Sequence, residues 1–143
     1  MPVISSAGTP LDAYGNVVAV KMTVTAGAVN SVTSKLNPFG SDFIVLGAAV
    51  YSTTVASTGS AVLDVGIAAT AAVSDILIDG LNINSATFPS GSTTFGIADS
   101  ITNAGTNGVN ANLWRAGEYL TATAVAQAST GFVGYVYVWG YVV

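Results

Sequence analysis

The sequence contains no cysteine and no histidine, and these two absences exclude much of the common enzyme chemistry. A Ser-His-Asp or Cys-His site needs an imidazole that accepts the proton of the nucleophile. Zinc sites use sulfur or imidazole ligands in nearly every case. The Gly-x-x-x-x-Gly-Lys-Ser/Thr motif that cradles phosphates is also missing. We therefore expect a protein that is not an enzyme and that holds no cofactor and no metal.

Charged residues are scarce. They make up 7% of the chain, against roughly 25% in an ordinary soluble domain. The only cations are Lys21, Lys35 and Arg115, and the net charge is −4. This is too little positive charge for a nucleic-acid partner. No unbroken apolar run reaches the roughly 20 residues of a membrane span, so we expect no membrane partner either. A surface with so few charges is expected to consist of small polar residues or to lie against other proteins.

The residues that are present favour β-structure. Hydrophobic residues form 51% of the 143-residue chain, and they occur in short β-branched runs between turn signals. Residues 17–25 alternate between apolar and polar side chains, as in a half-buried strand. Further strands are predicted at residues 42–55 (one strand, or two joined at Gly47), 61–68, 94–98, 118–126 and 132–143. The expected fold is all-β, a jelly-roll-like β-sandwich or barrel in residues 17–143, preceded by an extended N-terminal arm in residues 1–16.

Three local features are predicted within this pattern. Gly66 is expected at a β-bulge. Residues 69–78 form the one helix candidate, with Ser74 or Asp75 as its cap. The last two predicted strands are expected to pair as an antiparallel hairpin around the turn at residues 128–131. Residues 26–40 and most of residues 81–112 are expected to be turns and loops.

The acidic residues are the one remaining set with chemical potential: Asp12, Asp42, Asp64, Asp75, Asp79, Asp99 and Glu118. We interpret them mainly as turn, cap and surface residues, because Asp79-Gly80 is a standard turn pair. Two alternatives stay open. Asp75 and Asp79, with Asn82 and Asn84 nearby, could bind calcium through oxygen atoms. Two carboxylates at a suitable separation could also cleave a glycoside.

Aromatic residues alternate along the last predicted strand. Tyr135, Tyr137, Trp139 and Tyr141 share one face of that strand, and valines and Gly140 line the other. Because both faces are rich in large or apolar side chains, we predict that the row fills a core or a subunit interface. The alternative is that the rings stack on sugars.

Trp114-Arg115 is a second candidate for a subunit contact. It joins the only arginine to one of two tryptophans, and both residue types are enriched at interface hot spots. The alternative is a surface ion pair between Arg115 and Glu118.

Several segments resemble small virion structural proteins of tailed bacteriophages, namely the head decoration (cement) and head-fibre proteins. They are Ala-Val-Leu-Asp-Val-Gly-Ile-Ala-Ala at residues 61–69, Ser-Asp-Ile-Leu-Ile-Asp-Gly at 74–80, Trp-Arg-Ala-Gly-Glu-Tyr-Leu-Thr-Ala-Thr at 114–123, and Gly-Phe-Val-Gly-Tyr-Val-Tyr-Val at 131–138. The resemblance extends over residues 43–143, whereas residues 1–40 match nothing of the kind.

The resemblance implies a homotrimer that decorates the outer surface of the virion after assembly in the host cytoplasm. Such a protein stabilises the head by clamping adjacent subunits of the major capsid protein, its partner. The residues expected to clamp lie in the arm: Pro2, Val3, Ile4, Leu11 and Tyr14. The alternative function is a carbohydrate-binding or host-attachment module of a fibre.

Overall fold

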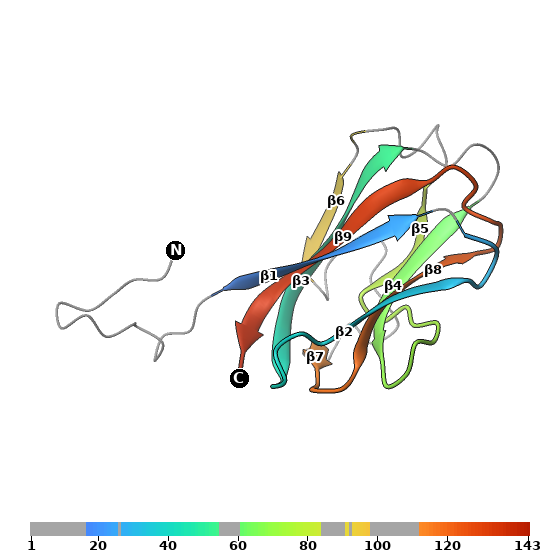
Figure 1. Ribbon diagram of the computed structural model, residues 1–143. Coiled ribbons are helices and arrows are strands. Elements are labelled where there is room, and N and C mark those ends of the chain that lie inside the picture. The colour runs from blue at the N-terminus through green and yellow to red at the C-terminus, as the bar shows by residue number, and fades with distance from the viewer. Residues whose placement is uncertain (1–16, 26, 55–60, 84–90, 92, 98–111) are drawn as a thin grey trace, which may run out of the picture.

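The computed structural model describes residues 17–25, 27–54, 61–83, 91, 93–97 and 112–143; the predicted arm, residues 1–16, lies outside this part. The described residues form two antiparallel β-sheets and contain no helix, so the all-β prediction is confirmed (Figure 1). Within them there is accordingly no helix of the length and apolar character that crossing a membrane requires. The strands are β1 (Val18–Thr25), β2 (Val32–Leu36), β3 (Phe43–Thr54), β4 (Val62–Ala68), β5 (Ile78–Asn82), β6 (Thr93–Ile97), β7 (Asn112–Trp114), β8 (Tyr119–Val125) and β9 (Val133–Val142).

The chain passes repeatedly from one sheet to the other. One sheet has the strand order β1-β9-β3-β6, with β7 also paired to β3, and the other has the order β2-β8-β4-β5. Strands that follow each other in sequence, such as β1 and β2 or β8 and β9, therefore mostly lie in different sheets. The two sheets face each other (Figure 1), and their inward side chains form one hydrophobic core. This arrangement is a β-sandwich in the broad sense that also covers half-open barrels.

The alternation predicted for the first strand is present in β1. Val20, Met22 and Val24 are at most 6% exposed, whereas the intervening side chains, Lys21 among them, face solvent. β3 is a single strand whose register against β9 shifts between Val45 and Gly47, as expected for a strand interrupted at that glycine.

Gly66 is not the bulge that the sequence predicts. It pairs regularly with Thr121 on β8, and the irregularity of β4 lies between Leu63 and Val65. A Cβ at position 66 would lie 2.6 Å from the backbone carbonyl carbon of Ser74. The glycine is therefore needed because another segment approaches the strand closely.

The helix predicted for residues 69–78 is wrong. Ser74 Oγ donates a hydrogen bond to the carbonyl of Ile67 (3.0 Å), and the Leu77 N–H donates to the carbonyl of Val65 (3.0 Å). Both groups thus bond to β4 and not within a helical turn. Leu77 and Ile78 are fully buried, so their packing against the core decides the conformation of this segment.

The predicted terminal hairpin is also wrong, because β8 and β9 lie in different sheets. Their connection turns at Ala126, which has a positive φ of 64°. It is held to the segment after β1 by a hydrogen bond from the Ser129 N–H to the carbonyl of Gly27 (3.1 Å). β2 lies in a segment expected to be turns, and β7 begins where the expected loop region ends. Neither strand was predicted, because both are short and β2 is largely polar.

Candidate functional site

The aromatic row lies on the outer side of the sheet that contains β9. Tyr135, Tyr137, Trp139 and Tyr141 are half-buried, and the alternating positions, including Val136 and Val138 at 0% exposure, face the core. The prediction that the four rings share one face is confirmed. The rings do not belong to the core of this chain, however, because they point away from the second sheet.

A fifth aromatic residue joins the row from β3. Tyr51 lies opposite Tyr135 in the β3–β9 register, and the two rings stack with centroids 6.4 Å apart and planes 6° apart. Tyr137 meets Tyr135 edge-on, at 6.2 Å and 68°. Such pairs contribute about 0.5–1.5 kcal/mol each beyond the area they bury. Tyr51 was not predicted as a site residue, because only the pairing of β3 with β9 brings it to the row.

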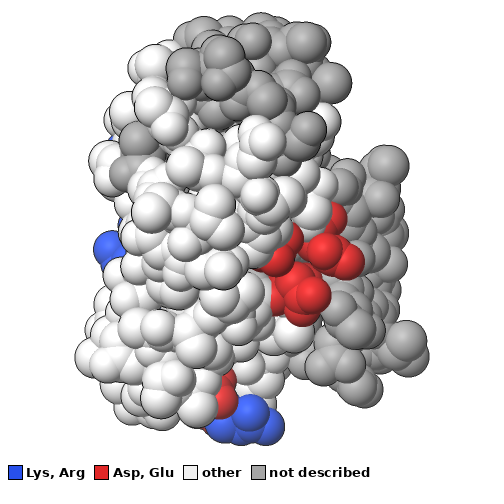
Figure 2. Space-filling model, turned by 90° about the vertical axis from the view of Figure 1, so that its right-hand side faces the viewer, with Lys and Arg blue, Asp and Glu red and all other residues white. Residues whose placement is uncertain are grey.

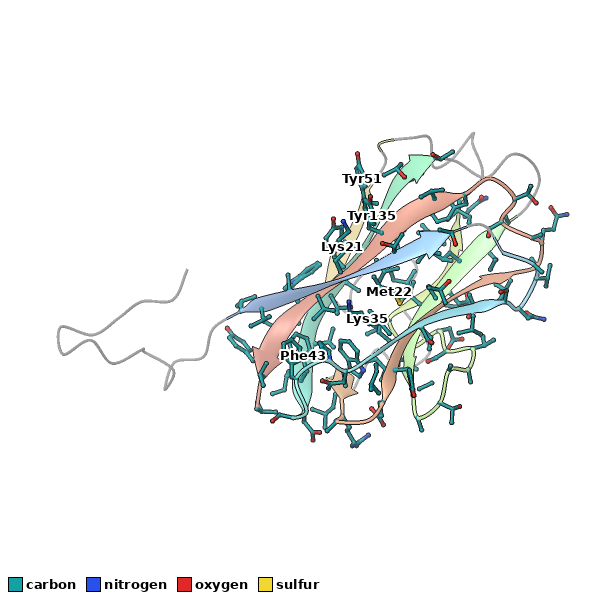
Figure 3. The ribbon with its side chains drawn as sticks, in the orientation of Figure 1. Lys21, Met22, Lys35, Phe43, Tyr51 and Tyr135 are labelled. Atoms are coloured by element: carbon teal, nitrogen blue, oxygen red, sulfur yellow. The ribbon has the colours of Figure 1, made fainter. Side chains whose placement is uncertain are left out.

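Lys21 supplies the one charge that the described strands place on this surface. It lies opposite Tyr137 in the β1–β9 register, and its Nζ sits 3.7 Å from the ring centroid of the diagonal neighbour Tyr135 (Figure 3). A cation–π contact at an exposed site contributes about 0.5–1 kcal/mol. No other residue of β1, β3, β6, β7 or β9 carries a charge.

These contacts determine what the surface offers to a ligand. One face of the Tyr135 ring is covered by the Lys21 ammonium, and the ring also stacks with Tyr51. Small residues lie beside Trp139, which is in register with Ala19 on β1 and Gly47 on β3. We call the outward side of β1, β9 and β3 the aromatic face. It is nearly uncharged, and part of its ring surface already contacts other side chains of the same molecule.

The edge of β1 opposite β9, which pairs with no other strand in the described part of the chain, is next to this face. Lys35 on β2 donates from its Nζ to the backbone carbonyl of Lys21 (3.1 Å), and both lysines lie on the same side of the molecule (Figure 3). A lysine at a sheet edge opposes the addition of another strand. Together the two ammonium groups make this edge the positive side of the molecule.

Trp114 does not lie on the aromatic face. It is fully buried in the core, where its ring meets Phe43 edge-on at 6.1 Å and its Nε1–H donates to the carbonyl of Glu118 (2.9 Å). The structure therefore corrects the prediction that its side chain forms a subunit contact. Arg115 makes the alternative contact, an ion pair with Glu118 at 3.4 Å, and its side chain is 62% exposed. Such a pair contributes little to stability.

Acidic side chains gather on the four-stranded sheet. Asp64 on β4 is 8% exposed, and its Oδ1 accepts a hydrogen bond from the Gly80 N–H on β5 (2.8 Å). Burial raises the pKa of Asp64, the carboxylates of Asp79 and Asp75 raise it further, and the Gly80 hydrogen bond lowers it. We call Asp64, Asp75 and Asp79 the acidic patch; Figure 2 shows a group of acidic side chains together on one face.

The calcium alternative includes Asn84, which lies outside the described residues, so the alternative stays a prediction. Among the described residues, no group of three or more acidic side chains is arranged to hold a metal ion. Asp79-Gly80 does not form a turn between strands, because both residues belong to β5. They lie at the register shift between β4 and β5, where Gly80 has a φ of 65°.

A small cavity of about 90 Å³ lies between the sheets beside the Gly27 turn. Its polar lining includes the hydroxyl groups of Ser31, Thr33 and Ser129, and none of its lining residues is charged. Ser129 Oγ already accepts a hydrogen bond from the Gly27 N–H (3.1 Å). The cavity is polar and large enough to hold water.

No known protein family matches the chain, and no curated protein is significantly similar to it.

Proposed function

We propose that this chain is a non-enzymatic structural protein of a bacteriophage virion, a decoration (cement) protein. It stabilises the head by clamping adjacent subunits of the major capsid protein. The observation that carries this proposal is the aromatic face, a half-buried surface of five rings with a single charge. Large aromatic residues with few charges are typical of the centre of protein–protein interfaces.

The strand order supports the finer description of the fold as a jelly roll. In such folds two four-stranded sheets are connected by two Greek keys, so that successive strands cross between the sheets. The orders β1-β9-β3-β6 and β2-β8-β4-β5 fit this pattern. Jelly rolls occur in viral capsid proteins and in lectins, so the fold by itself favours neither function over the other.

Carbohydrate binding is the second candidate, because Trp139 and Tyr141 are half-buried on the outside of a sheet. Sugars bind aromatic rings by stacking on their faces. At the other end of the row, Lys21 and Tyr51 already contact the Tyr135 ring. This arrangement leaves less ring surface for a sugar and favours a protein partner.

The test is binding of the purified chain to undecorated capsids of the phage that encodes it. We expect saturable co-sedimentation and capsids that resist heating better after decoration. A Trp139→Ala variant is expected to bind more weakly than wild type, whereas Arg115→Ala, on an exposed side chain away from the aromatic face, should bind like wild type. If the folded protein does not bind capsids but binds specific sugars on a glycan array, the result would favour the second candidate, carbohydrate binding.

The proposed role of the arm needs a separate variant. Pro2, Val3, Ile4, Leu11 and Tyr14 lie outside the described residues, so the clamping role rests on the resemblance alone. Deletion of residues 1–16 is expected to weaken capsid binding while the β-sandwich stays folded. Unchanged binding of the deletion variant would exclude the arm as the clamp.

A further inference from the structure

We propose that the aromatic face binds a second copy of this chain, in a head-to-tail contact where Lys21 of one copy meets the acidic patch of the next. This deepens the proposed function, because it rests on the decoration role and on the homotrimer that the resemblance implies, and it names the surfaces that form the homotrimer.

The first reason is the separation of charge on the molecule. Lys21 lies on the outer side of the five-stranded sheet, and Lys35 bonds to its carbonyl from β2. Asp64 and Asp79 lie on β4 and β5 of the other sheet. In Figure 2 the acidic side chains gather on the face toward the viewer, whereas the basic side chains lie at the rim of that view. Two copies related head to tail can therefore bring opposite charges together.

The second reason is the apolar surface beside the acidic patch. Residues 69–73, Ala-Thr-Ala-Ala-Val, are exposed, and Val73 is 48% exposed. They lead directly to Asp75. An exposed apolar segment next to acidic groups matches a face made of aromatic rings and one ammonium group. The charge and the apolar character of the two surfaces are thus both complementary.

The charge of the aromatic face also disfavours the simplest symmetric dimer. In a two-fold contact the same face packs on itself, so each copy would bring Lys21 to a shared surface whose described residues include no acidic side chain. Burying two ammonium groups without a partner is unfavourable. A head-to-tail contact gives each Lys21 a carboxylate, and such contacts close into rings when the rotation allows it.

The size of the face agrees with a ring. β9 has 10 residues, and at about 3.4 Å per residue across three strands spaced about 4.8 Å apart the face measures on the order of 500 Å². Exposed Leu46 and Val17, at 36% and 57%, extend it at the Gly140 end. A stable pair buries about 800 Å² per partner, so one such contact is marginal. In a ring each copy makes two contacts, which suits the expected trimer.

The first experiment measures mass by light scattering across a range of protein concentrations. We expect a defined oligomer whose dissociation constant rises at least about tenfold in Lys21→Glu and in the double variant Asp75→Lys/Asp79→Lys. The triple variant Lys21→Glu/Asp75→Lys/Asp79→Lys restores opposite charges and should restore the oligomer. Arg115→Ala is the control and should match wild type. The single and double variants should also lose their effect at about 1 M salt, where charges are screened within about 3 Å.

The second experiment keeps the proposal testable if the triple variant does not fold. Because the chain has no cysteine, Lys21→Cys and Asp79→Cys each introduce a unique thiol. Under oxidation, a mixture of the two variants should form a mixed disulfide dimer, whereas neither variant alone should cross-link.

Three outcomes overturn the proposal: a wild-type monomer at all concentrations, charge variants with wild-type assembly, or cross-linking of Lys21→Cys with itself. The proposed function is tested separately by capsid binding. A monomer that still decorates capsids would refute the head-to-tail contact and leave the decoration role in place. An oligomer that shows the expected charge dependence but does not bind capsids would refute the decoration role and leave the head-to-tail contact in place.

Discussion

The substitution Gly140→Ala tests how closely β3 and β9 approach each other beneath the aromatic face. Gly140 is in register with Val18 on β1 and Val45 on β3, beside the bulge of β3. A Cβ at this position would overlap the carbonyl oxygen of Ile44 and would lie 2.8 Å from its carbonyl carbon and 3.2 Å from the Leu46 nitrogen. Ordinary contact begins at 3.4 Å. The backbone of β3 must therefore retreat by more than about 1 Å at the Ile44 carbonyl oxygen, because backbone atoms cannot rotate away.

The expected cost follows from what this retreat breaks. Loss of about two ladder hydrogen bonds costs about 1 kcal/mol each, and forced overpacking costs about 1–3 kcal/mol. The reduced chain entropy of an alanine in the unfolded state returns about 0.4–1 kcal/mol. The net loss is on the order of 3 kcal/mol, a large part of the 5–15 kcal/mol that stabilises a typical domain. The thermal midpoint should fall by roughly 10 °C.

Urea unfolding followed by tryptophan fluorescence and circular dichroism measures this loss. Trp114 is a suitable reporter because it is fully buried. Gly27→Ala is the control: its Cβ would lie 3.2 Å from Ser31 Cβ and 3.4 Å from Ser31 Oγ, so a shift of about 0.2 Å relieves the contact. Its free energy of unfolding should change by less than about 1 kcal/mol. If the two alanine variants unfold at the same urea concentration, the result contradicts the close approach of the β3 backbone to Gly140.

Two further predictions concern buried polar groups. Because the folded state raises the pKa of Asp64, folded protein retains its proton just above pH 3.8 while unfolded protein has lost it. Stability should therefore fall as pH rises through that window, and Asp64→Asn should abolish this fall in unfolding measured from about pH 3 to 8. The buried Asn37 donates to the carbonyls of Ser41 (3.0 Å) and Trp114 (2.8 Å), and its Oδ1 accepts from the Phe39 N–H (2.8 Å). Asn37→Ala should cost about 2–4 kcal/mol in urea unfolding; a loss below about 1 kcal/mol would contradict these bonds.

Strand positions and strand faces were predictable because the period of two is a local signal. The alternation of Val20, Met22 and Val24 with polar residues needs no knowledge of the rest of the fold. The same rule predicts that Tyr135 and Tyr137 share a face. What it leaves open is whether that face points into the core or away from it.

The predictions that were wrong or incomplete depend on contacts between segments that are distant in sequence. Ser74 and Leu77 carry a helix-like pattern, but their hydrogen bonds go to β4. The β8–β9 connection has the length and residues of a hairpin turn, yet it crosses between the sheets. Tyr51 and Lys21 join the aromatic row only through the pairing of β1 and β3 with β9. Such pairings depend on topology, which residue spacing within one strand does not contain.

The pairing of β1 with β9 also determines when the domain can fold. β9, the last strand in sequence, is the central partner of both β1 and β3. During synthesis β1 and β3 leave the ribosome long before the strand that joins them, so the backbone edges that pair with β9 have no permanent partner until β9 has emerged. Contacts of such high sequence separation slow folding and prolong the exposure of strand edges. The low charge of these strands makes that interval a period of aggregation risk, and the exposed lysine on β1 opposes early pairing with other chains.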